Sequence, residues 1–175
     1  DLYVTPDQRG YHESGPFCKW GDMRREAMQA IAAAGGKIKY GHSEVGNFAV
    51  DGKMYEQNEI EFLPVDVEEA ADQLLIAKWI LREMAYRYGV NLTFAPKITV
   101  GKAGSGMHIH TKVVKDGQNM YLADGKLTDV AKTVIAGILD SAAALTAFGN
   151  TNPTSYLRLV PHQEAPTNIC WGDRN

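Results

Sequence analysis

The most restrictive feature of this sequence is a pair of strand-like stretches enclosed between two helix-like ones. The helical stretch MRREAMQAIAAA comes first, with Asp22 as its expected cap and an apolar stripe at Met23, Ala27, Ile31 and Ala34. A longer helical stretch runs from its cap at Asp66 to Gly89, and the residues that recur in it at helical spacing are Val67, Ala70, Ala71, Leu74, Ala77, Lys78, Leu81 and Met84. Between them lie the strand-like stretches KIKYGHSEV and MYEQNEIEF, joined by residues 46–53, which we expect to be a turn-rich loop around Asp51-Gly52. Because a hairpin separates the helices, the sequence predicts an α+β fold: a largely antiparallel sheet with flanking helices, rather than a doubly wound one.

The second half of the chain continues this pattern with weaker signals. We expect strands at NLTFA and MHIHTKVV, the second of them preceded by the glycine-rich stretch GKAGSG and followed by a hairpin turn at KDGQ. A third helix is expected from about Thr128 to Phe148, and NTNPTSY is expected to be a loop. Short extended pieces in LRLVPHQEAP and a final strand at TNICWG complete the prediction.

Composition limits the classes of function. The chain has 175 residues, 45% of them hydrophobic and 22% charged, with a formal net charge of −3. This is typical of one globular domain, and the charge shows no basic stripe for nucleic acid. Charged residues and glycine interrupt every apolar stretch, so no membrane partner is expected. Cys18 and Cys170 form no zinc or disulfide pattern, which favours a cytoplasmic location.

Two histidines in GSGMHIH are the first candidate site. His108 and His110 are two residues apart, so on a strand they would lie on the same side. This spacing alone is compatible with a metal site, a phosphate site or a plain sheet surface. Imidazole together with carboxylates suits Mg²⁺, Mn²⁺ or Zn²⁺, and a generic metallohydrolase is one alternative. The glycine stretch matches no phosphate-binding fingerprint, but its bare backbone would let a ligand approach closely.

Carboxylates and one arginine supply the other candidates. HSEV places Glu44 on a predicted strand, and EQNEIEF supplies Glu56, Glu59 and Glu61 on the next. Glu59 and Glu61 would share one face of that strand. The segment RLVPHQEAP brings Arg158 and Glu164, and an arginine is well suited to hold a carboxylate or phosphate through two hydrogen bonds. Each of these residues, taken alone, also fits an ordinary solvated surface.

Taken together and in this order, these motifs resemble the glutamine synthetase family. The resemblance rests on GSGMHIH, on HSEV followed by QNEIEF, and on NPTSYLRLVPHQEAPTNICWGDRN, and it extends over nearly the whole chain. It implies a ligase that joins glutamate and ammonia at the expense of ATP through an acyl phosphate, as part of glutamine biosynthesis and nitrogen metabolism. It also implies Mg²⁺ or Mn²⁺ as cofactor, ATP as co-substrate, small-molecule substrates and a homo-oligomer.

The resemblance also assigns roles to individual residues. Glu44 and Glu59 match ligands of one metal ion, with Glu56 and Glu61 as alternatives for the second position, and His108 matches a ligand of another metal ion. The remaining roles concern substrate, nucleotide and catalysis. Gly104, Arg158 and Tyr11 match residues that bind the substrate, and His110 and Arg174 match residues that bind ATP. Glu164 and Arg158 match catalytic residues, and Glu164 is the flap residue that accepts a proton from ammonium.

The resemblance further implies that the chain is one partial catalytic domain, residues 1–175. The family's small N-terminal domain and the C-terminal end of its catalytic domain would be absent, so we expect the piece by itself to be inactive. Ala103 stands where the family usually has an asparagine that contacts the amino acid, and alanine offers no side-chain hydrogen bond. Two alternatives therefore stay open: a glutamate–amine ligase that uses an amine other than ammonia, and a catalytically silent family member.

Overall fold

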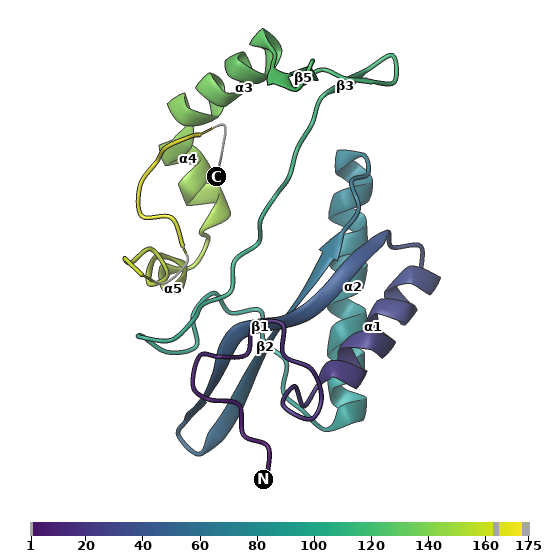
Figure 1. Cartoon of the computed structure of the whole chain (residues 1–175), viewed down its shortest axis with the longest axis vertical. Coiled ribbons are helices and arrows are strands. Elements are labelled where there is room, and N and C mark those ends of the chain that lie inside the picture. The colour runs from purple at the N-terminus through teal and green to yellow at the C-terminus, as the bar shows by residue number, and fades with distance from the viewer. Residues whose placement is uncertain (1, 163–164, 173–175) are drawn as a thin grey trace. The chain divides into compact units, whose positions relative to one another are not determined.

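The computed structural model describes residues 2–162 and 165–172, which form helices and antiparallel hairpins (Figure 1). Contacts divide the chain into two compact units, Asp1–Ser105 and Gly106–Asn175. The predicted α+β class is confirmed, and every pair of strands in the described residues is antiparallel. These strands, however, form three separate two-stranded sheets instead of one larger sheet.

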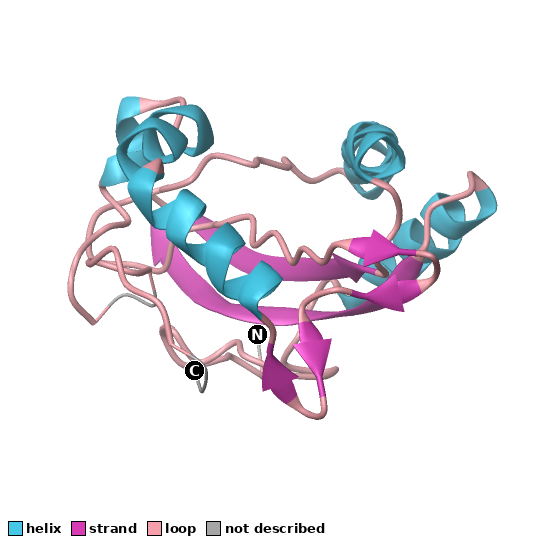
Figure 2. Cartoon of the chain, turned by 90° about the horizontal axis from the view of Figure 1, so that it is seen from above, coloured by secondary structure: helices cyan, strands magenta, loops and turns pink. Residues whose placement is uncertain are grey.

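The first unit is built on one long hairpin, drawn as the two longest arrows in Figure 2. β1 (Ile38–Val50) pairs with β2 (Lys53–Phe62). Asp51 and Gly52 form the turn with φ angles of 51° and 73°, as a two-residue turn with both central residues left-handed requires. The prediction of a loop over residues 46–53 was wrong, since the ladder continues to this turn and pairs Val50 with Lys53.

Helices α1 (Gly21–Ala33) and α2 (Val67–Tyr88) supply the core of this unit. The predicted stripe of α1 is buried at Met23, Ala27 and Ile31. On α2 the buried residues include the predicted Ala77 and Met84. Hydrophobic side chains from both helices form one buried cluster, against which residues of β1 and β2 pack. The core therefore lies between the two helices and the hairpin, and it fixes the hairpin's position.

The ends of these helices follow the sequence signals only in part. Gly89 ends α2 in the left-handed region at φ 66°, as predicted, and Asp66 occupies its N-cap position. Asp22 was expected to cap α1, but the helix begins two residues earlier than expected, at Gly21, and Trp20 is the N-cap. The expected strand at NLTFA does not form, because a strand needs a hydrogen-bonded neighbour and β1 and β2 pair only with each other in the described chain.

Two short hairpins open the second unit. β3 (Val114–Lys115) pairs with β4 (Gln118–Asn119), and β5 (Leu122–Ala123) pairs with β6 (Lys126–Leu127). The KDGQ turn is confirmed, with Asp116 and Gly117 both at positive φ, and Asp124-Gly125 repeats this geometry without having been predicted.

Three helices complete this unit: α3 (Asp129–Asp140), α4 (Ala142–Gly149) and α5 (Pro153–Tyr156). Thr128 caps α3 by accepting a hydrogen bond from the Ala131 amide at 3.2 Å. The single helix expected here is divided at Ser141, where α3 and α4 meet at a bend of 71°. Within the described residues, no single helix has the length and apolar composition to span a membrane, and only this bent pair passes that test jointly.

Three further expectations for the second unit were wrong. The loop expected at NTNPTSY contains the short helix α5. Of the strand expected at MHIHTKVV only Val114 is in β structure, and residues 107–113 have no regular secondary structure. His108 and His110 therefore do not share the face of a strand. The final strand expected at TNICWG also fails to form in the described residues, since those strands pair only as local hairpins.

Candidate metal centre

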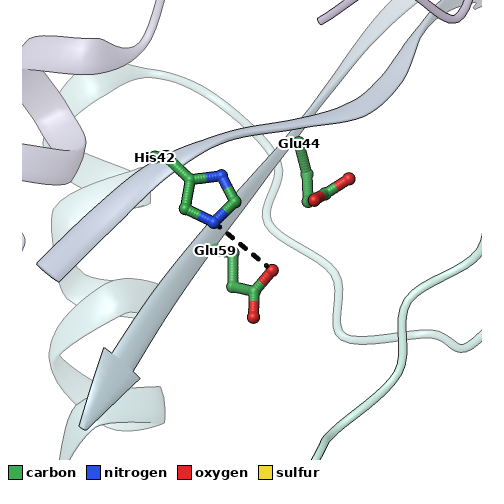
Figure 3. Close-up of side chains that lie close together, drawn as sticks. All are labelled: His42, Glu44 and Glu59. Atoms are coloured by element: carbon green, nitrogen blue, oxygen red, sulfur yellow. Dashed lines mark ion pairs between the residues drawn. The ribbon is translucent and has the colours of Figure 1, made fainter. Parts of the chain in front are cut away.

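Three side chains of the β1–β2 hairpin converge on one point (Figure 3). His42 and Glu44 come from β1, and Glu59 comes from β2 directly opposite His42. One potential ligand atom from each lies within 4.8 Å of the others. The His42 Nε2 and Glu59 Oε2 atoms are 3.7 Å apart. Imidazole nitrogen with two carboxylates is a donor set that fits Mg²⁺, Mn²⁺ or Zn²⁺.

The backbone of β1 prepares the imidazole for this role. The His42 Nδ1 atom lies 2.8 Å from the Ser43 carbonyl oxygen, which can only accept a hydrogen bond. Nδ1 must therefore carry the proton, and in the neutral ring the lone pair then belongs to Nε2, on the side of Glu59. A histidine that donates its second ring nitrogen to a carbonyl is the usual arrangement of a metal ligand.

A β-bulge begins at Glu44. Ser43 pairs with Asn58, and the next pair is Asn47 with Glu56, so three residues of β1 stand opposite Gln57 alone. The segment before α1 lies along this bulge, where the amide of Gly10 donates to the Val45 carbonyl at 3.3 Å. A Cβ on Gly10 would lie 2.5 Å from the Glu44 carbonyl oxygen, so this close approach requires glycine.

The other two glutamates of β2 have different partners. Glu56 lies on the opposite face from Glu59 and accepts hydrogen bonds from the backbone amides of Lys19 at 2.7 Å and Trp20 at 3.2 Å, at the start of α1. It therefore supplies an acceptor and a negative charge at the start of α1, whose N-cap residue is Trp20 and not the predicted Asp22. Glu61 forms an ion pair with Lys39 at 2.8 Å.

Two further groups in this region have raised pKa values. A hydrogen bond to Glu61, with a smaller contribution from burial, raises the pKa of Tyr40 above its usual range. Burial, followed by the charge of Glu56, raises the pKa of the Cys18 thiol, whose Sγ donates to Glu56 Oε1 at 3.3 Å. Both groups are therefore neutral at physiological pH and donate to these carboxylates.

Tyr11 lies beside the cluster. Its ring packs edge-on against the His42 ring, with centroids 5.4 Å apart, and is tilted against His12 at 4.3 Å. Tyr40 stacks on His42 from elsewhere on β1, at 5.6 Å. The imidazole of His42 is thus held by aromatic neighbours, and 58% of the Tyr11 surface remains exposed. Tyr11 can therefore contact a ligand that reaches this side of the hairpin.

Gly104 is tied to the same hairpin. Its carbonyl oxygen accepts a hydrogen bond from the Gln57 side-chain amide at 2.8 Å. Ala103, one residue earlier, is buried, with 8% of its surface exposed. The structure therefore places Gly104 next to β2, whereas the Ala103 methyl group faces the protein interior.

In the second unit, Arg158 lies close to the start of the histidine segment. A Cβ on Gly106 would lie 2.9 Å from the Arg158 Nη1 atom and 3.8 Å from the His108 Nε2 atom. Arg158 Nη2 donates to the Asn150 side-chain oxygen at 3.2 Å. Its Nε atom is buried and has no hydrogen-bond partner in the described part of the chain. The guanidinium group therefore keeps unused donors beside His108, as binding of a carboxylate or phosphate requires.

The remaining predicted residues are His110, Glu164 and Arg174. His110 is exposed in the irregular segment after His108. Glu164 and Arg174 lie outside the described residues. Conversely, His42 was not singled out from the sequence. The signal that could have found it is its position two residues before Glu44 on a predicted strand, the same spacing that drew attention to His108 and His110.

The fold and this group of residues define an α+β unit that carries a candidate carboxylate–imidazole metal site on a hairpin. Comparison with known proteins is more specific. The family model described as "Glutamine synthetase, catalytic domain" matches residues 1–175. The chain belongs to the glutamine synthetase family, as the motifs predicted.

Named relatives agree with this assignment. The chain is 37% identical to glutamine synthetase of Thermus thermophilus over 174 residues, which is 98% of this chain and 37% of that protein. It is 38% identical to glutamine synthetase of Pyrococcus furiosus, over 97% of this chain and 37% of that protein. The chain thus spans little more than a third of these relatives' length.

Solved structures show the same fold. The cryo-EM structure of Plasmodium falciparum glutamine synthetase matches 89% of this chain and 29% of that chain, with 27% identity and a TM-score of 0.80. A structure of GmaS without ligand matches 90% of this chain and 36% of that chain, with a TM-score of 0.71. At 22% identity, the second match concerns the fold alone.

Proposed function

We propose that the protein is an ATP-dependent carboxylate–amine ligase that makes glutamine from glutamate, ammonia and ATP. In this reaction an oxygen of the glutamate side-chain carboxylate attacks the γ-phosphorus of ATP, and ADP leaves. Ammonia then attacks the acyl carbon, phosphate leaves with the C–O bond electrons, and a base takes the surplus proton. The observation that carries the proposal is the group of His42, Glu44 and Glu59 in a chain that matches the family model along its whole length.

The residues of the hairpin support the metal-dependent part of this proposal. Glu44 and Glu59 would hold Mg²⁺ or Mn²⁺ together with His42, whose ring is already oriented by the contact of Nδ1 with the Ser43 carbonyl. When bound, such an ion offsets the negative charge of the phosphoryl oxygens during transfer. Because Glu56 and Glu61 are engaged elsewhere, we assign the β2 ligand to Glu59.

Residues outside the hairpin would bind the substrates. Arg158, with its unpaired buried Nε, would hold the substrate carboxylate, and His108 beside it would serve a second metal ion. The backbone of Gly104 and the ring of Tyr11 would contact the amino acid and the ammonium ion. His110 and Arg174 would contact ATP, and Glu164 would take the proton from ammonium. The whole protein would be a cytoplasmic homo-oligomer to which residues 1–175 contribute part of one catalytic domain.

Phosphate release from ATP by the full-length protein tests the proposal. We expect release to require glutamate, a divalent cation and ammonia together, with glutamine formed in equal amount. Release that requires none of the three would refute the ligase assignment, and so would its absence with every acceptor. The latter result would indicate a catalytically silent member of the family.

An amine other than ammonia is the second candidate acceptor. Ala103 is the observation that favours it, because a buried methyl group cannot supply the side-chain hydrogen bond that the family's asparagine gives to the amino acid. The assay therefore includes a panel of primary amines next to ammonia. Stimulation by one of these amines, without stimulation by ammonia, would replace the glutamine-forming reaction by formation of an N-substituted amide.

A further inference from the structure

Gln57 fills the β-bulge that carries Glu44. The bulge leaves backbone groups of β1 without a cross-strand partner, and the Gln57 Oε1 atom accepts a hydrogen bond from the Gly46 amide at 2.9 Å. The two residues are packed closely, since a Cβ on Gly46 would lie 2.7 Å from that oxygen. The Gln57 side chain therefore substitutes for the ladder hydrogen bond that the bulge removes, and its position is fixed at this end.

The other end of the same side chain holds the glycine loop. Its Nε2 atom donates to the Gly104 carbonyl oxygen at 2.8 Å and to the Ser105 Oγ atom at 3.1 Å. A side-chain amide has two N–H donors and one carbonyl acceptor, so every group of Gln57 is in use. One side chain thus joins the bulge of β1, the strand β2 and a loop nearly fifty residues further along the chain.

The alternation of β2 places this link beside the candidate metal centre. Gln57 and Glu59 are two residues apart on β2 and face the same side, whereas Glu56 faces the start of α1. Glu44 is the first residue of the bulge that Gln57 fills. One short segment of β2 therefore both carries the Glu59 carboxylate and holds the Gly104 backbone in place.

We infer that Gln57 is a positioning residue for the amino-acid substrate, because it fixes the peptide backbone of Gly104 and Ser105 relative to the strand that carries Glu59. The inference rests on the proposed function, in which the Gly104 backbone contacts that substrate. Gln57 itself touches neither the substrate nor the reacting atoms in this scheme. Its effect is to keep a preorganised binding surface, which lowers the cost of ordering that surface when the ligand binds.

The glycine loop has other contacts that would survive the loss of Gln57. The Ser105 amide donates to the Pro96 carbonyl at 2.9 Å, and Lys97 Nζ donates to the Lys102 carbonyl at 2.5 Å. Lys102 in turn forms an ion pair with Asp7 at 2.5 Å. Removing the Gln57 amide should therefore loosen Gly104 and Ser105 locally while the loop stays attached to the unit.

Two substitutions separate the functions of the side chain. Gln57→Met keeps the length and the unbranched shape but removes all three hydrogen bonds. Gln57→Glu keeps the acceptor for Gly46 and can accept from the Ser105 hydroxyl, but it places a carboxylate oxygen against the Gly104 carbonyl. Gln73→Met is the matched control, because Gln73 is also a buried glutamine that accepts from a backbone amide, that of Lys37 at 2.9 Å, and it belongs to α2.

The test measures binding and turnover in the full-length protein. Both Gln57 variants should raise the KM for glutamate about tenfold, the equivalent of about 1.4 kcal/mol or one neutral hydrogen bond. The turnover number and the KM for ATP should change less than twofold, and Mn²⁺ binding should be retained. Hydrogen exchange should become faster at the Gly46 amide in Gln57→Met only, and around residues 104–106 in both variants. Gln73→Met should leave all these quantities near their original values.

The outcomes distinguish this inference from the proposed function. An equal rise in the KM values for glutamate and ATP, or unchanged glutamate binding despite faster exchange at residues 104–106, would overturn the positioning role. Glutamate binding is also measured by calorimetry in the presence of Mn²⁺. A protein that binds glutamate but releases no phosphate would contradict the ligase reaction, and the tenfold change in its glutamate affinity would still decide the role of Gln57. A protein that binds no glutamate would refute both.

Discussion

Replacing Glu56 and Glu59 separately by glutamine tests whether the two faces of β2 have different functions. The two residues are three positions apart and have the same side chain, but Glu56 receives the amides at the start of α1 and Glu59 faces His42. Glu56→Gln should therefore change the stability of the fold, whereas Glu59→Gln should change metal binding. Each variant is the matched control for the other.

The structure sets the size of each effect. Glutamine at position 56 loses the charge at a helix N-terminus, worth about 1 kcal/mol. It also keeps only one acceptor oxygen, so either the Lys19 amide, which now donates to Oε2, or the Trp20 amide, which now donates to Oε1, loses its acceptor, at a cost of about 1 kcal/mol more. We expect Glu56→Gln to lower the free energy of unfolding by roughly 2 kcal/mol. At position 59, a unit charge and a divalent ion about 4 Å apart in water attract each other by roughly 2 kcal/mol, so Mn²⁺ affinity should fall about 30-fold.

Urea unfolding and calorimetric Mn²⁺ titration of the full-length protein measure these two quantities. Glu56→Gln should retain Mn²⁺ affinity within about threefold, and Glu59→Gln should retain stability within about 0.5 kcal/mol, as expected for a half-exposed surface residue. A result in which Glu56→Gln weakens Mn²⁺ binding and Glu59→Gln does not would refute the register of β2 and, with it, the assignment of the metal ligand.

Three further predictions concern stability and thiol chemistry. The folded-state pKa of Cys18 is raised above the ordinary value of 9.0, so its contribution to stability is complete below pH 9 and is lost as the pH rises through the folded-state pKa. Cys18→Ser should therefore flatten the fall in unfolding free energy above pH 9. An unchanged slope would contradict the raised pKa. Iodoacetamide should alkylate exposed Cys170 well before buried Cys18, as mass spectrometry of timed samples can check. Gly89→Ala should lower the unfolding free energy by about 1 kcal/mol, since Gly89 ends α2 at φ 66°, and a neutral result in urea unfolding would show that α2 ends differently.

The sequence predicted those elements whose signals are local. Asp51-Gly52 and Asp116-Gly117 require positive φ at two successive residues, and both turns form where the dipeptides predict them. Gly89 likewise stops α2 by its own conformational freedom. The periodic stripe of α1 was sufficient to predict Met23 and Ile31 as core residues. In each case the information lies within a few neighbouring residues.

The failed predictions depend on partners that lie elsewhere in the chain. NLTFA and MHIHTKVV have the composition of strands, but a strand exists only if a second strand offers its ladder, and periodicity does not report that neighbour. The cap of α1 shows the same limit. Asp22 satisfies the local rule for an N-cap, but Glu56, more than thirty residues away, receives the amides of Lys19 and Trp20 instead.

The candidate site depends both on local sequence signals and on partners that lie elsewhere in the chain. The alternation of EQNE predicts that Gln57 and Glu59 share a face of the strand. The pairing of His42 with Glu59 decides which face of β2 looks toward α1. A shift of this register by one residue would exchange the residues of the two faces. The bulge between Ser43 and Asn47 is equally invisible in the sequence, although it creates the gap that Gln57 fills. The acceptor for the start of α1 (Glu56), the loop anchor (Gln57) and the proposed metal ligand (Glu59) therefore lie within four residues of one strand, and their functions follow from the register rather than from the residue types.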